Sequence, residues 1–434
     1  MAPGVGAALR LFPKANSMKL AVTRGVCPRI SALITIAMAV SARAAEPDCN
    51  EGLTRSTLTT CGLNNSPVLA AELATVHSST ARREAARPFL PSNPSVGATL
   101  GSRATADARA TNWSVTLAQE LEVAGQSLLR VDVADDELSA ANAQLRVVRA
   151  ELAEQLWLAW FDAIAARERV KLASRLEQAT GDVARTARGM ASNGLSSTVD
   201  AALADAAWVA ASERRLEAQR EARASLLRLQ SLTGVHVELG GDADLEPLRA
   251  TGNAEVRPEL KALEALKSAS SRRVELLRRT RVPNPTITLF AQNDGFNERV
   301  LGVGVGVPIP LPQPVGRTRA GEIDEALAAE ERLQAELGGM LRRLATERGL
   351  ADSDTLAVSE KRSLFTAERI ETATRALQAL STQLSAGRLT VREALVSQQS
   401  FVELLQSELA MREAACVASV RATRANGLSL EGDL

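Results

Sequence analysis

Hydrophobic residues follow two different periods along this chain of 434 residues. In four stretches they recur at every second position, which predicts β-strands with one apolar face each. The stretches are 95–101, 113–123, 286–292 and 300–309, and their apolar face includes Val115, Leu117, Val303 and Val305. Polar residues or glycine fill most of the intervening positions. Such alternation is the same whether the apolar face meets a protein core or lipid.

After each strand pair, the apolar positions step by three and four, which predicts long helical hairpins over 126–233 and 315–425. The first run, from Gln126 to Gly189, holds 64 residues without proline. At 1.5 Å per residue it would be about 95 Å long, whereas an average helix has only about 11–12 residues. The run from Val315 to Leu384 predicts a second helix of similar length. Helices of this size are typical of rods, coiled coils or tubes.

The two strand–hairpin sets are copies of each other. Asn93-Pro94 and Asn284-Pro285 lie 191 residues apart, as do Gly125 and Gly316, while Gly194 and Gly387 are 193 apart. We therefore expect an internally duplicated, mainly α chain with a β part. The predicted divisions are a first repeat over 66–234, a connector over 235–256, a second repeat over 257–425 and a tail over 426–434.

The N-terminus predicts export. Basic residues precede the apolar run from Ile30 to Val40, and Ala42-Arg43-Ala44 follows as a cleavage site. We expect a signal peptide over 1–44, with Met18 as an alternative start, because the run is shorter than the roughly 20 residues that span a bilayer. A polar, loosely ordered segment is expected over 45–65. Cys49 and Cys61 within it could pair in an oxidising compartment.

The composition excludes several classes of function. The 51 basic and 51 acidic residues cancel, so the chain lacks the charge expected of a nucleic-acid-binding protein. His77 and His236 stand far apart in sequence without acidic or cysteine partners nearby, and no nucleotide-binding or nucleophile motif occurs. We predict that the chain is not an enzyme and has neither a cofactor nor a metal site.

Three stretches resemble one family. Residues 66–100, 114–126 and 385–410 are similar to the first helix and strand, the strand-to-helix signature and the helical turn of the TolC-like outer-membrane efflux proteins, the outer membrane factors. The second stretch is especially similar to the CzcC-like heavy-metal efflux branch. The resemblance implies a homotrimer in the cell outer membrane. Each chain would give four strands to a twelve-stranded β-barrel in lipid, and its long antiparallel helical hairpins to an α-barrel that extends into the periplasm.

The implied function is a passive exit duct for heavy-metal cations in a tripartite efflux system. Its partners would be a periplasmic adaptor (membrane fusion) protein and an inner-membrane pump of the resistance–nodulation–division (RND) type. One alternative is a duct of the same kind for drugs, solvents or secreted polypeptides. Another is a periplasmic coiled-coil adaptor without a barrel, which the four-strand set disfavours.

The resemblance also implies that the hairpin turns at Gly194 and Gly387 gate the periplasmic entrance. Asp200 and Glu393 follow these glycines by six residues. In a trimer they would form carboxylate rings at the aperture, but exposed carboxylates are equally common at helix starts. The family's second acid would fall near Leu203 and Val396, and neither is acidic.

Overall fold

The computed structural model describes residues 49, 53–104, 108–240, 243–249, 254–295, 298–311, 315 and 318–431. The chain divides into the units Met1–Glu46 and Pro47–Leu434, and all described residues belong to the second. The predicted signal peptide with Met18, as well as Gly316, lies outside the described residues.

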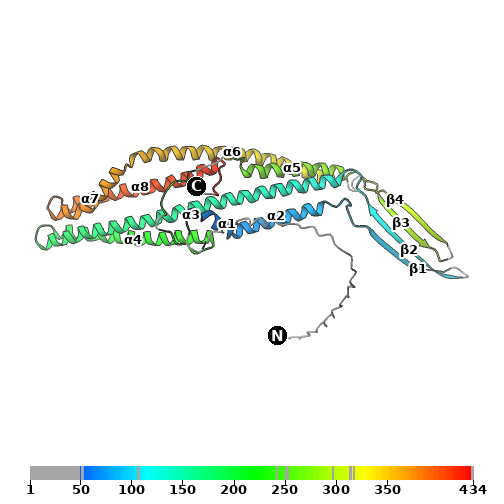
Figure 1. Ribbon diagram of the computed structural model, residues 1–434, viewed down its shortest axis with the longest axis horizontal. Helices are drawn as coiled ribbons and strands as arrows, with labels where there is room; N and C mark the ends of the chain where they lie inside the picture. Colours follow the sequence, from blue (N-terminus) through cyan, green and yellow to red (C-terminus); the bar gives the residue numbers. More distant parts are fainter. Residues whose placement is uncertain are drawn as a thin grey trace, which may run out of the picture. The chain divides into compact units, whose positions relative to one another are not determined.

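The second unit contains two copies of a helix, two strands and a long helical hairpin, preceded by one short helix (Figure 1). The elements are α1 Leu58–Asn64, α2 Pro67–Ala86, β1 Ser95–Ala104, β2 Arg109–Glu120, α3 Gln126–Ser192, α4 Thr198–Thr233, α5 Pro258–Arg279, β3 Thr286–Asn293, β4 Arg299–Gly306, α6 Ala320–Leu364, α7 Ala367–Ser385 and α8 Val391–Ala425. The predicted duplicated, mainly α architecture is therefore confirmed. No helix of the described part combines the length and apolar character of a transmembrane helix.

All four strands join one antiparallel sheet in the order β1-β2-β3-β4, so the two repeats meet at β2 and β3. The register aligns the apolar positions in rows: Leu117 pairs with Leu289, which pairs in turn with Val303. Four predicted strand ends were wrong: β1 runs on to Ala104 and β2 begins already at Arg109, whereas β2 stops at Glu120 and β4 at Gly306. β4 pairs no further because its partner β3 begins after Pro285, and Pro308 has no N–H to donate to a ladder.

The first long helix is continuous, but the second is not. α3 holds 67 residues, about 100 Å at 1.5 Å per residue. The predicted counterpart from Val315 to Leu384 is interrupted at Phe365 and Thr366, between α6 and α7. Thr366 has an extended backbone, with φ −74° and ψ 149°, and its side chain accepts a hydrogen bond from the Arg369 N–H. A threonine in this role caps a new helix, so α7 starts afresh.

A central hydrophobic core joins segments that are far apart in sequence. Trp157 and Phe161 of α3 are fully buried in it, together with Leu53 and Leu58. The Trp157 indole N–H donates to the Leu430 carbonyl at 3.1 Å. The expectation of a loosely ordered segment over 45–65 was therefore wrong for its described part, since apolar side chains spaced along it pack onto α3 and α1 forms there.

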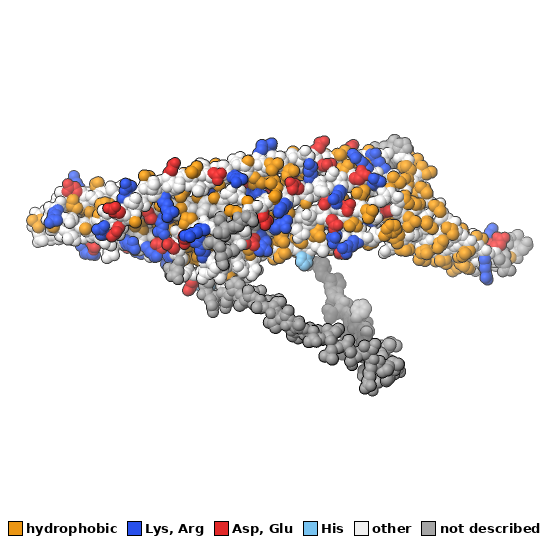
Figure 2. Space-filling model, turned by 45° about the horizontal axis from the view of Figure 1, so that its top comes forward, with side chains coloured by type: hydrophobic (Ala, Val, Ile, Leu, Met, Phe, Trp, Pro, Cys, Tyr) orange, Lys and Arg blue, Asp and Glu red, His pale blue; other side chains and the backbone are white. Residues whose placement is uncertain are grey.

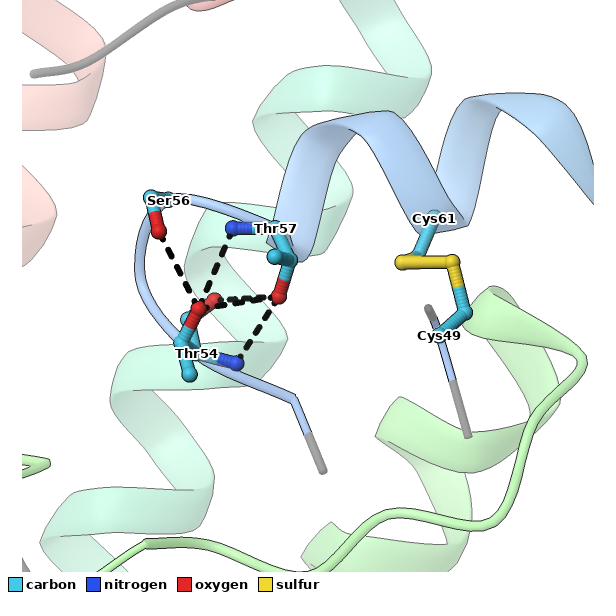
Figure 3. Close-up of a disulfide and its surroundings, with 5 residues drawn as sticks. All are labelled: Cys49, Thr54, Ser56, Thr57 and Cys61. Carbon is cyan, nitrogen blue, oxygen red and sulfur yellow. Dashed lines mark hydrogen bonds between the residues drawn. A yellow bond between two sulfur atoms is a disulfide. The ribbon is translucent and has the colours of Figure 1, made fainter. Parts of the chain in front are cut away.

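The disulfide that the sequence left open, Cys49–Cys61, is formed (Figure 3). It closes a loop that also contains a compact hydrogen-bonded turn. There the Thr54 N–H donates to the Thr57 hydroxyl at 3.0 Å, and the Thr57 N–H donates to the Thr54 hydroxyl at 3.3 Å. Burial raises the pKa of the remaining thiol in this core, Cys416, to about 12, so it stays protonated and does not compete for the bond.

Candidate functional site

Both hairpin turns are built in the same way around a glycine. Gly194 and Gly387 have φ of +73° and +70°, a backbone conformation that residues with a Cβ adopt at a cost. The Leu195 N–H donates to the Met190 carbonyl at 2.8 Å, and the Arg388 N–H donates to the Gln383 carbonyl at 3.0 Å. These six-to-one bonds satisfy the last carbonyls of α3 and α7, as in a Schellman cap.

Three residues after each glycine stands the N-cap residue of the returning helix, Ser197 before α4 and Thr390 before α8. The Ser197 hydroxyl accepts from the Asp200 N–H at 3.0 Å, and the Thr390 hydroxyl accepts from the Glu393 N–H at 3.3 Å. The Glu393 carboxylate accepts in return from the Thr390 N–H at 2.8 Å, which completes a capping box. These hydrogen bonds from the Thr390 backbone and hydroxyl lower the pKa of Glu393 below its usual range. Both predicted carboxylates are thus the third residue of a helix and take part in its cap.

The structure brings the two turns together through a residue that the sequence did not single out. Arg392 lies 3.5 Å from Asp200, between its Nε and a carboxylate oxygen. A second ion pair, between Arg188 and Asp205 at 3.0 Å, lies on the first hairpin. The partner of Asp200 is 192 residues away in sequence, so no local pattern could have identified Arg392. Because arginines stand beside these carboxylates, the tips are not a purely acidic surface.

The tips also expose apolar side chains. Leu195 and Val199 are largely exposed, and Leu203 and Val396, where the family pattern led us to look for further acids, are exposed as well. Apolar residues therefore stand at those two positions and face outward.

The apolar face of the sheet is uncovered within the chain. Val115 and Leu117 are 43% and 40% exposed, and Val303 and Val305 are each 69% exposed. In the described part no helix packs broadly against the sheet. Figure 2 shows hydrophobic side chains gathered over the sheet and its junction with the helices, whereas charged side chains are spread along the helices. The four predicted strand residues thus share one large exposed apolar surface.

Several charged side chains meet between the two repeats. A cavity of about 520 Å³ between α3, α6 and α8 is lined by Glu154, Glu347 and Arg424, among others. Beside it, Arg257 lies 2.7 Å and Arg424 3.4 Å from Glu259. Burial opposes ionisation of Glu259, but its bonds to Arg257 and the charge of Arg424 outweigh it and lower the pKa to about 2. These groups pair with one another, as in a structural ion network.

Among the described residues, no group of three or more histidine, cysteine, aspartate or glutamate side chains is arranged to hold a metal ion. His236 is exposed and lies 3.8 Å from the Glu238 carboxylate, on the connector.

No protein-family model matches the chain. Solved structures match it over most of its length. It is similar to the outer-membrane channel OprN (18% identity, 86% of this chain and 90% of OprN, TM-score 0.71). It is equally similar to the outer membrane protein VceC of Vibrio cholerae (16% identity, 86% and 96%, TM-score 0.71). CusC, for which transmembrane channel formation is described, matches with TM-score 0.70 at 16% identity over 86% of this chain and 91% of CusC. The fold is that of the TolC-like outer-membrane efflux channels.

This efflux-channel fold explains why a duplicated chain ends in one sheet and two matched turns. The structural match covers nearly the whole length of these solved chains. Among curated proteins, the nickel-cobalt-cadmium resistance protein NccC of Alcaligenes xylosoxydans xylosoxydans is 24% identical over 238 residues. That match covers 53% of this chain and 54% of NccC, so the chain spans about half the length of this relative.

Proposed function

We propose that this chain is the outer-membrane subunit of a tripartite efflux system and forms a passive exit duct for heavy-metal cations. The observation that carries the proposal is the uncovered apolar face of a four-stranded sheet at one end of helical hairpins, in a chain with the efflux-channel fold.

The sheet supports both a membrane location and a homotrimer. β1 and β4 are edge strands, and their outer backbone N–H and C=O groups have no strand partner among the described residues. In lipid such groups must be paired, and closing the sheet with further copies of the chain would pair them. Three copies would give a closed sheet of twelve strands, with the apolar face toward lipid and the serine-, threonine- and glycine-rich face toward water.

The helices support a reach into the periplasm. α3 alone is about 100 Å long, and its turn with α4 lies beside the turn between α7 and α8 (Figure 1). We propose that these tips contact a periplasmic adaptor, which links the duct to an inner-membrane pump of the RND type. The exposed apolar residues at the tips, such as Val199 and Val396, suit such a contact.

The tips would also form the aperture. In a trimer, Asp200 and Glu393 would stand in rings near the entrance, where carboxylates attract cations. Arg392 would moderate this field in each chain by pairing with Asp200. We expect Asp200→Ala with Glu393→Ala to reduce cation preference in planar bilayers, and Leu203→Ala with Val396→Ala to leave it unchanged. An unaltered preference in the carboxylate variant would remove both residues from the aperture.

The cargo is inferred from NccC, whose name assigns it to nickel, cobalt and cadmium resistance. The decisive experiment deletes the gene and measures growth on nickel, cobalt, cadmium and zinc salts, with hydrophobic dyes and organic solvents as the comparison. Selective metal sensitivity, restored by the intact gene, is the expected result. Sensitivity to dyes alone would assign the duct to drugs, and recovery of the chain in soluble periplasm without detergent would contradict the channel itself.

A further inference from the structure

The junction between sheet and helices carries exposed apolar residues that no strand requires. Val307, Ile309 and Leu311 follow β4, keep its alternation, and are 56%, 81% and 48% exposed. Pro308 and Pro310 stand between them and have no N–H to donate, so this segment is unsuited to strand pairing. Its apolar side chains therefore extend the exposed apolar face of the sheet beyond Gly306, where the pairing of β4 with β3 ends.

Arginines stand beside this segment. Arg278 and Arg281, at the end of α5, are exposed and make no ion pair with another described residue. The pairing of Thr286 with Gly306 places the entry to β3 and the exit from β4 at the same end of the sheet. From the helical side, Arg319 donates to the Thr280 hydroxyl at 3.2 Å. Arg278, Arg281 and the apolar segment 307–311 thus lie at the same end of the sheet, where it joins the helices.

The first repeat has a similar arrangement, although its arginine, Arg87, pairs with Glu84 at 2.8 Å. Arg87 follows the end of α2, and Phe89 and Leu90 come next, 69% and 37% exposed, before β1. Arg130 of α3 donates to the Pro88 carbonyl at 3.2 Å and so holds this entry against the helices. An arginine-bearing helix end therefore precedes both strand pairs, and it is followed by Phe89 and Leu90 in the first repeat and by Val282, 44% exposed, in the second.

Two further observations concern the lipid boundary at the end of the sheet that joins the helices. β3 and β4 have only eight residues each, whereas membrane strands need about 9–11. The strands contain two aromatic residues, Trp113 and Phe290, and neither stands at the helical end, where a membrane sheet usually carries an aromatic belt. Something other than strand length and strand aromatics must then define the lipid boundary at that end.

We propose that the collar, consisting of Arg278–Val282 and Val307–Leu311 with Arg87–Leu90 of the first repeat, seats in the headgroup layer of the periplasmic leaflet. Its apolar side chains meet the acyl boundary, and Arg278 and Arg281 bind phosphates of anionic phospholipids. A guanidinium group suits this role because it is always charged and forms paired hydrogen bonds to phosphate oxygens. The proposal rests on the membrane location inferred above.

The depth of the collar is tested by fluorescence. The full chain is purified, labelled with an environment-sensitive dye at Ile309→Cys, Val303→Cys or Leu216→Cys, and reconstituted with brominated phospholipids. Of the four native cysteines, Cys27 lies in the predicted signal peptide and is absent from the exported chain, two form the disulfide, and Cys416 is buried. We expect the dye at 303 to be quenched by bromines within the acyl chains, the dye at 309 by bromines near the headgroup, and the dye at 216, on α4, by neither.

The outcomes separate the two proposals. Absence of quenching at position 303 would overturn the membrane location of the sheet. Quenching at 303 together with no more quenching at 309 than at 216 would overturn the collar alone.

The lipid partner is tested by charge removal. Arg278→Gln with Arg281→Gln is compared with Arg175→Gln with Arg348→Gln, two exposed helical arginines that also lack an ion pair among the described residues. Both variants are reconstituted in mixed phosphatidylglycerol and phosphatidylethanolamine, and the lipid retained after detergent extraction is measured by mass spectrometry. We expect retained phosphatidylglycerol to fall about threefold only in the collar variant. Equal retention in both variants would refute binding by these arginines.

Discussion

The long helices of the two repeats descend from one pattern, yet they are packed very differently. α3 buries 22 of its 67 residues and contacts helices of both repeats. α6 buries four of its 45 residues and packs broadly only against α5 and α8. In α3 the apolar stripe is enclosed by one chain, whereas in α6 much of it, including Leu341 and Leu356, stays exposed. The two repeats therefore share the helical spacing of apolar residues, but their long helices pack against different neighbours.

The largest expected effect compares one large apolar residue from each long helix. Trp157 of α3 is fully buried, whereas Leu350 of α6 is 61% exposed. Trp157→Ala should lower the free energy of unfolding by about 3–5 kcal/mol, because it leaves a large cavity and an unpaired Leu430 carbonyl. Leu350→Ala should change it by less than about 0.5 kcal/mol in the dissociated chain. Urea denaturation of both variants gives the two values, and similar losses would show that α6 is as enclosed as α3.

The disulfide fixes the segment around α1, which packs on α3 and α4 of the first repeat. Removing it by Cys49→Ser with Cys61→Ser should cost about 2–3 kcal/mol, as expected for a short closed loop. Denaturant unfolding with and without dithiothreitol measures this. Reductant should destabilise the wild-type chain and leave the double variant unchanged; a further loss in the variant would mean that reduction acts elsewhere.

Glu259 ties the repeats together through a charge network, and its effect depends on pH. Its folded pKa of about 2 lies below the ordinary value of 4.5. The stabilisation is therefore complete above pH 4.5 and is lost as the pH falls toward 2. We expect Glu259→Gln to cost about 2 kcal/mol at pH 7 and to flatten the acid limb of the stability curve. Exposed Glu264→Gln is the control, and an equally flattened acid limb in that variant would contradict the assignment.

The smallest effect concerns the interruption that separates α6 from α7. Thr366→Ala removes the cap of α7 and should lower local stability by about 1 kcal/mol. Amide hydrogen exchange should then be faster at 367–370. Thr355→Ala, within α6, should leave that exchange unchanged. If the Thr366 variant exchanges like wild type, the restart of α7 does not depend on its cap.

Much of the candidate site followed from sequence, because its determinants are local. A glycine that ends a helix, a hydroxyl residue three positions later and a carboxylate three further on specify a turn and a cap within ten residues. Gly194, Asp200, Gly387 and Glu393 were identified from the internal repeat and the family resemblance, and the structure adds the hydroxyl caps Ser197 and Thr390. The role of the two glycines and two carboxylates at a channel entrance stays a prediction, because it requires other copies of the chain. The left-handed residue before α6 was missed, because it is Arg319, with φ 55°, where Gly125 serves the first repeat.

The sequence by itself determined which stretches are strands and helices, that the set occurs twice, and how each hairpin turns. These properties depend on the period of side chains and on caps within a few residues. Only the tertiary structure decided that the segment around Leu53 and Leu58 is core, that Cys49 bonds to Cys61 and not to Cys416, and that Arg392 faces Asp200. Those outcomes depend on how separate segments align in space, including two hairpins whose residues Asp200 and Arg392 are 192 positions apart. A local pattern carries no information about that alignment.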